Sequence, residues 1–163
     1  MQIRIAGTVN DSIVDGPGFR FTVFTQGCPH HCEGCHNPQT HDYNGGKIVD
    51  TQSIIDEIAD NPLLDGITLS GGEPFEQSEA CAELCDAAHE LGLNVWAYSG
   101  YTFEKLAADP VRRKLLEKCD ILIDGPFVLA QRTLDARFRG SKNQREIDVK
   151  ASLEAGRAVE TEA

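Results

Sequence analysis

The feature that most constrains the fold is an alternation of short apolar runs with helical segments, which begins near residue 50. Residues 67–69, 93–97 and 121–123 form apolar runs of the length and composition typical of buried strands. The segments between them carry apolar residues at helical spacing, and the clearest stripe comprises Ala80, Cys81, Leu84, Cys85, Ala88 and Leu91. Strands that alternate with helices indicate βαβ units and a parallel sheet.

The two ends of the chain have a different pattern. Residues 3–9 predict a weak strand, and residues 19–25, which are aromatic and β-branched at a period of two, predict a second strand. Residues 26–46 have little periodicity and many Gly, Pro, His and Cys residues, and a loop of that length in a small domain usually carries function. Residues 147–149 predict a last strand. The tail from Ala151 is charged and built of small residues, so we expect it to fray.

A chain of 163 residues suits one compact domain, so we expect residues 1–163 to form a single domain. A closed barrel of eight strand–helix repeats requires roughly 250 residues. The expected fold is therefore α/β, an open partial (β/α)6 TIM-like barrel with a mostly parallel sheet of about six strands. Chemistry in such folds gathers at the carboxyl ends of the strands. Three unusual loops are expected there, formed by residues 26–46, 70–74 and 124–126.

The composition argues against two kinds of partner. The formal net charge is −11, whereas binding to a nucleic-acid backbone requires clustered Lys and Arg. Hydrophobic residues make up 40% of the chain and are too evenly spread for a membrane span. The first residues, Met1 to Ile5, lack the apolar core of a secretory signal. We therefore expect a cytoplasmic protein that binds neither nucleic acid nor a membrane.

Six Cys residues in such a chain indicate metal ligands or buried thiols rather than disulfides. Three of them, Cys28, Cys32 and Cys35, lie together in the polar loop, at spacings that let their thiolates meet at one small centre. Thiolates suit iron–sulfur clusters and zinc. Three thiolates on a four-iron cluster leave one iron free to chelate a substrate, and an open position is what a catalytic metal requires.

Two other interpretations use the same residues. A histidine, either His36 or else His30 or His31, could complete a Cys3His zinc site in a binding module that is not an enzyme. A distant Cys could instead complete a four-Cys cluster in an electron carrier. Spacing alone leaves these alternatives open.

The other Cys residues are better explained as core side chains. Cys81 and Cys85 are four residues apart on an apolar helical stripe, and Cys119 adjoins a predicted buried strand. We expect all three to pack as small hydrophobic residues and to take no part in the chemistry.

Two motifs of the sequence, taken together, resemble those of the radical S-adenosylmethionine superfamily. The first is Cys28-x3-Cys32-x2-Cys35, and the second is the Gly-Gly-Glu sequence of residues 71–73 at the end of the next predicted strand. The resemblance implies a radical SAM fold, a [4Fe-4S] cluster held by the three Cys residues, and S-adenosyl-L-methionine bound at the open iron. It also implies an oxidoreductase that works under anaerobic conditions.

Further segments narrow the resemblance to the enzymes that activate glycyl-radical proteins. Residues 14–20 and 35–37 are similar to that wider group, whereas residues 95–102, 124–127 and 138–145 resemble the activating proteins of anaerobic ribonucleoside-triphosphate reductase. The similarity runs from about residue 5 to residue 149, nearly the whole chain. Pyruvate formate-lyase activating enzymes share the motifs at residues 14–20 and 35–37, but they are longer and lack the motif at residues 138–145.

The resemblance also implies a reaction and partners. Flavodoxin or a ferredoxin-type donor would reduce the cluster, and the electron would cleave S-adenosylmethionine to methionine and a 5′-deoxyadenosyl radical. That radical would take hydrogen from a glycine Cα on the large subunit of anaerobic ribonucleoside-triphosphate reductase. The alternative is activation of another glycyl-radical enzyme, such as pyruvate formate-lyase. Residues 138–145 form a polar segment that is a candidate contact for the protein partner.

The same resemblance assigns the cofactor contacts to residues at strand ends or beside the cluster. The residues expected to contact S-adenosylmethionine are Gly34, Cys35, His36, Gly71, Gly72, Glu73, Ser99 and Asp124. Of these, Ser99 and Asp124 are candidates for ribose or methionine contacts. No catalytic residue beyond the cluster and cofactor ligands is expected, because the cofactors carry the radical chemistry.

Different roles are expected for the residues on the two motifs. Gly71 and Gly72 would let backbone approach the methionine moiety, which a Cβ would hinder, and Glu73 would orient its amine and carboxylate. Gly34 and His36 flank the third Cys on the side expected for the adenine. Many superfamily members have an aromatic residue where this chain has Gly34, and reductase activators often have one where it has His36.

Overall fold

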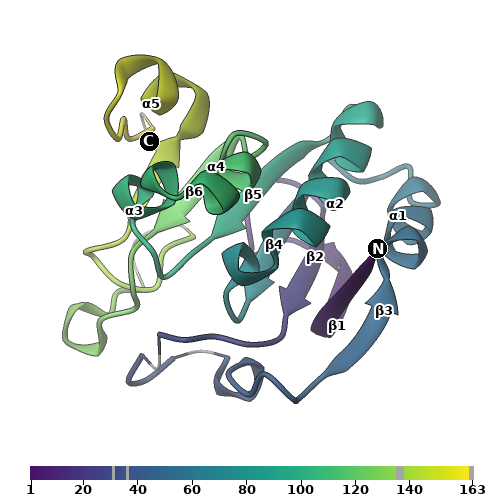
Figure 1. Ribbon diagram of the computed structural model, residues 1–163, viewed down its shortest axis with the longest axis horizontal. Helices are drawn as coiled ribbons and strands as arrows, with labels where there is room; N and C mark the ends of the chain where they lie inside the picture. Colours follow the sequence, from purple (N-terminus) through teal and green to yellow (C-terminus); the bar gives the residue numbers. More distant parts are fainter. Residues whose placement is uncertain (31, 36, 135–137, 162–163) are drawn as a thin grey trace.

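The computed structural model describes residues 1–30, 32–35, 37–134 and 138–161. Within these residues the strands form one seven-stranded sheet in the order β3-β1-β2-β4-β5-β6-β7. The strands are β1 (Gln2–Ser12), β2 (Arg20–Thr25), β3 (Lys47–Asp50), β4 (Gly66–Gly71), β5 (Asn94–Tyr98), β6 (Ile121–Asp124) and β7 (Arg145–Asp148). The sheet is open, with β3 and β7 at its two edges (Figure 1).

Four helices lie side by side over one face of this sheet (Figure 1). The helices are α1 (Thr51–Ala59), α2 (Ser78–Glu90), α3 (Phe103–Ala108) and α4 (Pro110–Leu116), and α5 (Val149–Ala155) follows β7 at the sheet edge. Three short 3-10 segments complete the description: η1 (Pro38–Thr40), η2 (Pro74–Gln77) and η3 (Leu129–Gln131). No helix in the described ranges is long and apolar enough to cross a membrane.

The centre of the sheet agrees with the sequence prediction and its flanks do not. Strands β2, β4, β5 and β6 are parallel neighbours joined by helical crossovers. The outer strands β1, β3 and β7 each pair antiparallel, so half of the pairings within the described residues are antiparallel. The expected α/β class and the open sheet are therefore confirmed, whereas the sheet is mixed and not mostly parallel.

The physical reason lies in the connections. A parallel pair needs a crossover of about a dozen residues or more, usually through a helix. Residues 13–19, between β1 and β2, are too few for one, and the described residues between β6 and β7 contain no α-helix. Strand β3 escapes sequence prediction because it is short and largely exposed, and only its pairing with β1 defines it.

Side-chain caps place the helix boundaries. Asp50 begins α1 by accepting a hydrogen bond from the Gln52 amide at 2.9 Å, and Thr102 begins α3 by accepting one from the Lys105 amide. The residues between β5 and β6 form two helices. Asp109 ends α3 and caps α4 through the Val111 amide at 2.9 Å, because the following Pro110 cannot continue the first helix.

The segment from Ala151, which the sequence suggests is frayed, is attached to the sheet edge. Residues up to Ala155 belong to α5, and Gly156 ends it in the left-handed conformation with φ 72°. The chain then returns beside β7, where the Asp148 amide donates to the Val159 carbonyl at 2.9 Å and the Thr161 amide to the Glu146 carbonyl at 2.8 Å.

The two faces of the central strands have different chemistry. One set of alternating residues is apolar, includes Phe21, Val23, Ile67 and Leu69, and packs in the core beneath the helices. The residues between them point to the opposite face and are polar or amphipathic: Arg20, Thr22, Thr68, Ser70, Trp96 and Tyr98. This second face is also mostly buried, and its residues Ser70 and Tyr98 form part of the floor of the cavity described below.

Arg20 fixes that floor in place. Its guanidinium is fully buried and donates to the Thr68 hydroxyl at 2.8 Å, the Ile67 carbonyl at 2.7 Å and the Asn94 side chain at 2.7 Å, so it crosslinks β2, β4 and β5. It also lies 5.7 Å from the centre of the Trp96 ring. Burial lowers the pKa of Arg20 to about 10, which still leaves the side chain charged at neutral pH.

Candidate functional site

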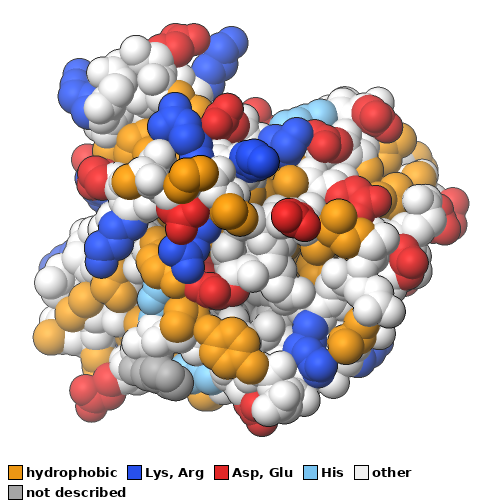
Figure 2. All heavy atoms as spheres, in the orientation of Figure 1, with side chains coloured by type: hydrophobic (Ala, Val, Ile, Leu, Met, Phe, Trp, Pro, Cys, Tyr) orange, Lys and Arg blue, Asp and Glu red, His pale blue; other side chains and the backbone are white. Residues whose placement is uncertain are grey.

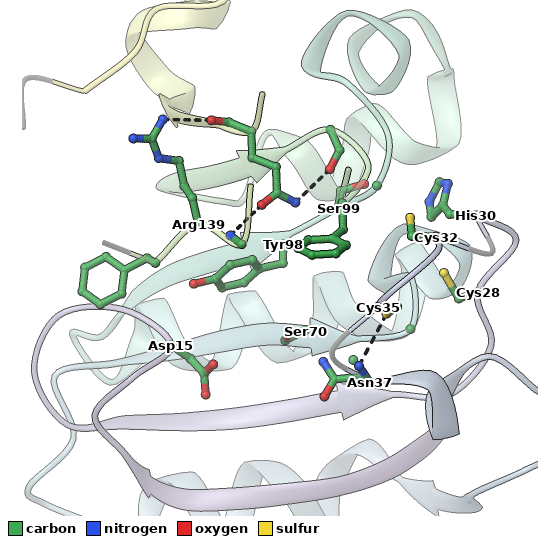
Figure 3. A pocket seen from close by; sticks show the side chains of 18 of the residues that line it. Asp15, Cys28, His30, Cys32, Cys35, Asn37, Ser70, Tyr98, Ser99 and Arg139 are labelled. Carbon is green, nitrogen blue, oxygen red and sulfur yellow. Dashed lines mark hydrogen bonds between the residues drawn. The ribbon is translucent and has the colours of Figure 1, made fainter. Parts of the chain in front are cut away.

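A cavity of about 640 Å³ opens at the carboxyl ends of the parallel strands. Its lining comes from the segments that follow β2, β4, β5 and β6, including Cys28, Gly72, Ser99 and Gly125. The prediction that the cysteine loop, the Gly-Gly-Glu-Pro loop and the Asp-Gly-Pro loop meet at this edge is therefore confirmed. The loop between β1 and β2 and the segment before β7 line the side of the cavity away from the cysteines. Asp15 and Arg139 are among their lining residues (Figure 3).

The three clustered cysteines line the same end of this cavity (Figure 3). All three are free thiols; Cys28 is buried and Cys32 and Cys35 are half-buried. Burial raises the pKa of the Cys28 thiol to about 11 and raises that of Cys32. Both thiols therefore stay protonated at neutral pH without a metal, so metal binding must displace their protons.

Backbone N–H groups are directed at each of these sulfur atoms. The Asn37 amide donates to Cys35 at 3.4 Å. Backbone hydrogen bonds from His30 and Phe127 act to lower the pKa of Cys28 and Cys32, against the larger effect of burial. Hydrogen bonds of this kind stabilise thiolate charge and help to set the potential of an iron–sulfur cluster. Three free thiols, each with a backbone donor, on the wall of a cavity fit a cluster with three protein ligands.

The residues considered for a zinc site are described only in part. Among the described residues, no group of three His, Cys, Asp or Glu side chains is arranged to hold one ion. Of the histidines considered for a zinc site, His31 and His36 lie outside the described residues, and the ring of His30 is hydrogen-bonded to Glu73.

The other three cysteines are not among the cavity-lining residues and lie in the core, in agreement with their predicted role. Cys81, Cys85 and Cys119 are buried between α2, α4 and the sheet. Burial raises the pKa of Cys81 well above its ordinary value, and a hydrogen bond with Cys85, together with burial, does the same for Cys119. Buried, protonated thiols of this kind are poor nucleophiles and poor metal ligands.

The two glycines of the Gly-Gly-Glu sequence line the cavity, but close packing against protein backbone is what requires them. An added Cβ at Gly71 would lie 2.5 Å from the Thr25 nitrogen. One at Gly72 would lie 2.4 Å from the Gly27 carbonyl oxygen and 2.9 Å from that of Thr40. Both glycines therefore let the end of β4 pack directly against the beginning of the cysteine loop.

Glu73, which is expected to orient the amine and carboxylate of S-adenosylmethionine, is held by protein groups in the structure. Its side chain is fully buried, is not among the cavity-lining residues, and accepts hydrogen bonds from protein groups. The Ser99 hydroxyl donates at 2.9 Å, the Gly100 amide at 2.8 Å and the Phe75 amide at 3.1 Å. Ser99 lines the cavity beside it. The structure thus brings Ser99 and Glu73 together, with Ser99 nearer to the open space.

Asp124 is hydrogen-bonded to protein groups, and Gly34 packs against a side chain. The Asp124 carboxylate is buried, accepts from the Phe103 amide at 2.7 Å and from Arg145 Nε at 3.0 Å, and does not line the cavity. The hydrogen bond to Asp124 raises the pKa of Arg145. Gly34 faces Leu129, whose side chain would be 2.7 Å from an added Cβ. The expected adenine contact of His36 falls on a residue outside those described.

Sequence reasoning missed most of the cavity wall remote from the cysteines. Asp15, Tyr98 and Arg139 lie at that end (Figure 3), and Asp15 is held by the Ser12 hydroxyl at 2.7 Å. Burial, followed by the nearby Asp15 carboxylate, raises the pKa of Tyr98. The available signal was positional, because Tyr98 directly follows the predicted strand at residues 93–97. Arg139 lies in the segment 138–145, which the sequence indicates as a partner contact and not as part of the cavity wall.

Comparison with known proteins agrees with the thiol chemistry. Residues 14–147 match a family described as a 4Fe-4S single cluster domain, a span that contains all three cavity cysteines. The fold and the three-thiol cavity thus define an iron–sulfur protein with one [4Fe-4S] cluster.

Relatives define the group more closely. The chain is 34% identical over 140 residues to the anaerobic ribonucleoside-triphosphate reductase-activating protein of Pasteurella multocida, covering 81% of this chain and 89% of that one. It is 32% identical over 142 residues to the protein of the same description from Escherichia coli K12, with 81% and 90% covered. The counterpart from Enterobacteria phage T4 is 33% identical, with 81% and 85% covered. The chain belongs to the family of anaerobic ribonucleoside-triphosphate reductase-activating proteins.

A solved structure supports the fold independently. The chain is similar to QueE from Escherichia coli with a TM-score of 0.50 and 16% sequence identity, over 63% of this chain and 54% of that one. The chain thus spans little more than half of QueE, and at this identity the likeness shows the fold alone.

Proposed function

We propose that this protein is a radical S-adenosylmethionine activase that generates a glycyl radical on anaerobic ribonucleoside-triphosphate reductase. The observation that carries the proposal is the set of three free thiols, each facing a backbone N–H donor, on the wall of the 640 Å³ cavity. The named activating proteins at about one-third identity support the same function.

Cys28, Cys32 and Cys35 would hold the cluster, and three thiolates leave the fourth iron available to the amine and carboxylate of S-adenosylmethionine. When bound, the cluster supplies one electron and S-adenosylmethionine supplies the 5′-deoxyadenosyl radical that takes hydrogen from a glycine Cα. The chain itself positions these groups. Ser99 and the backbone of residues 71–72 face the space beside the thiols, and Glu73 holds Ser99 in place.

The protein partner must reach the cavity through its mouth, since the glycine has to lie beside the bound cofactor. Val14 and Leu134 both line the cavity and are 71% and 96% exposed, so they form an apolar rim that a partner segment would cover. Figure 2 shows hydrophobic side chains gathered around the segment that follows β6, where Leu129 is also exposed. We infer that the glycine-bearing segment of the reductase large subunit docks on this rim, and that a flavodoxin or ferredoxin-type protein supplies the electron.

The function is tested by anaerobic incubation of the reconstituted protein with the reductase, dithionite and S-adenosylmethionine. Electron paramagnetic resonance should detect a glycyl radical on the reductase, and its yield should depend on S-adenosylmethionine. Colourless protein that binds stoichiometric zinc after strictly anaerobic purification would contradict the proposal. Transfer of the radical to pyruvate formate-lyase, and not to the reductase, would contradict the assigned partner.

Replacing the exposed rim residue Leu134 with Asp should weaken the partner step alone. We expect reductase activation to fall about tenfold, because a charge replaces an apolar contact on the docking surface. Cleavage of S-adenosylmethionine by the reduced protein without the reductase should be unchanged. The matched control is Leu63→Asp, since Leu63 is 72% exposed but lies before β4, at the opposite ends of the strands. Equal activation by the two variants would rule out the rim as the docking surface.

A further inference from the structure

We propose that His30 is a positioning residue that fastens the cysteine loop to the buried carboxylate of Glu73, and so fixes the thiols for cluster binding. The proposal rests on the proposed function in one respect, which is that residues 28–35 form the loop that binds the cluster. Two observations carry it. The His30 ring fits closely beside Gly100 and is hydrogen-bonded to the fully buried Glu73 carboxylate. His30 also lies two residues from Cys28 and from Cys32.

His30 bonds in two directions. Its ring Nε2 lies 2.6 Å from Glu73 Oε1, and since a carboxylate can only accept, the ring N–H donates. A backbone hydrogen bond from His30 also acts on the Cys28 thiol. The histidine side chain is 14% exposed and that of Glu73 is 0% exposed, so water competes little for this hydrogen bond. One residue therefore connects a cluster ligand to the protein interior.

Glu73 is a suitable anchor because its other partners are rigid. It accepts from the Gly100 amide and the Ser99 hydroxyl at the end of β5, and from the Phe75 amide at the beginning of η2. The carboxylate thus joins the ends of β4 and β5, which are held by the parallel sheet. His30 attaches the cysteine loop to this junction. Removing the His30 side chain would leave the buried Glu73 carboxylate with one hydrogen-bond donor fewer.

The ring of His30 occupies a slot that the neighbouring residues leave for it. An added Cβ at Gly100 would lie 2.3 Å from His30 Cδ2 and 2.6 Å from Cγ. On another side, the Tyr101 ring meets the imidazole edge-on at 76°, with the centroids 4.5 Å apart. Glycine is needed at position 100 for space, because any side chain there would push against the imidazole.

This arrangement separates anchoring from ligation. A histidine between two metal-ligating cysteines is also a candidate ligand, as the sequence suggests for a zinc site. In the structure, however, one ring nitrogen is committed to Glu73 and the ring lies between Gly100 and Tyr101. The geometry therefore supports a role in holding the loop, through which His30 acts on the cluster indirectly.

The test measures loop order and iron binding, and needs neither S-adenosylmethionine nor the reductase. In the metal-free full-length protein, His30→Ala should raise amide hydrogen exchange across residues 28–40 about tenfold while leaving exchange in α2 unchanged, which shows that the protein remains folded. After anaerobic reconstitution and desalting, it should retain less than about half of the wild-type iron. His30→Gln, which keeps an N–H donor, should restore part of both. His89→Ala is the matched control, because His89 pairs with Asp120 at 3.2 Å on an exposed surface, and should change neither.

A double-variant cycle tests the slot itself. Gly100→Ala should reproduce the effects of His30→Ala, because the new methyl displaces the imidazole. In the His30→Ala background the slot is empty, so Gly100→Ala should add little further effect. Independent, additive effects would overturn the proposed slot, and wild-type exchange and iron retention in His30→Ala would overturn the anchor. Failure of wild-type protein to bind iron would instead contradict the proposed function, while the exchange measurement would still decide the role of His30.

Discussion

Cys32→Ala is expected to give a protein that binds no stable [4Fe-4S] cluster and cannot generate a glycyl radical. Cys32 is one of three thiols on the cavity wall, and the backbone hydrogen bond from Phe127 has no sulfur acceptor once the thiol is removed. Two thiolates cannot hold a four-iron cluster against loss to solvent. Iron and sulfide analysis after anaerobic reconstitution, together with the visible absorption of the cluster, measures the effect.

Cys81→Ala is the matched control for this loss. Cys81 is fully buried on α2, and burial holds its pKa well above the ordinary thiol value, so it contributes packing and no ligand. We expect unchanged iron content and unchanged activity, with a fall in the free energy of unfolding of about 1 kcal/mol from the small cavity left behind. Equal iron loss in the two variants would show that the assignment of ligand and core cysteines is wrong.

Gly72→Ala is expected to disrupt both folding stability and cluster binding. The added methyl would lie 2.4 Å from the Gly27 carbonyl oxygen and 2.9 Å from that of Thr40. These are backbone atoms, and the Gly27 amide itself donates to the Thr40 carbonyl at 2.7 Å, so neither can move alone. We expect a loss of about 3 kcal/mol in the free energy of unfolding of the metal-free protein, measured by denaturant titration. Iron retention should also fall, because Gly27 immediately precedes Cys28.

A second glycine shows whether space is the cause. An added Cβ at Gly7 on β1 meets no atom within 4 Å, so Gly7→Ala should leave stability unchanged or raise it by about 0.5 kcal/mol. If Gly72→Ala were as stable as Gly7→Ala and retained its iron, close packing of the β4 end against the cysteine loop would not be essential to the site.

Local patterns predict a large part of this molecule. The central strands and the helices between them follow from apolar periodicity, because their buried faces repeat along the chain. The meeting of the three loops follows from parallel strand order, since parallel strands end at the same edge of a sheet. The division of the cysteines also follows from sequence, because Cys28, Cys32 and Cys35 lie in a polar loop and Cys81 on an apolar stripe.

Other features depend on residues that are far apart in the chain. Strand β3 is defined by its pairing with β1, and the connections between β1 and β2 and between β6 and β7 make those two pairs antiparallel. The partners of Glu73 come from three separate segments, and Asp124 pairs with Arg145 across 21 positions. No periodicity encodes such contacts, so the sequence could suggest a chemical type for each residue but not its partners.

The sequence by itself determined which thiols can bind a metal, which strands lie at the centre of the sheet and which loops meet at its edge, because spacing and periodicity are local properties. Only the tertiary structure decided that Glu73 faces the interior, that His30 lies in a slot beside Gly100, and that exposed Val14 and Leu134 share one cavity mouth. These are consequences of packing, in which the position of each side chain depends on the space and the hydrogen-bond partners that distant residues supply.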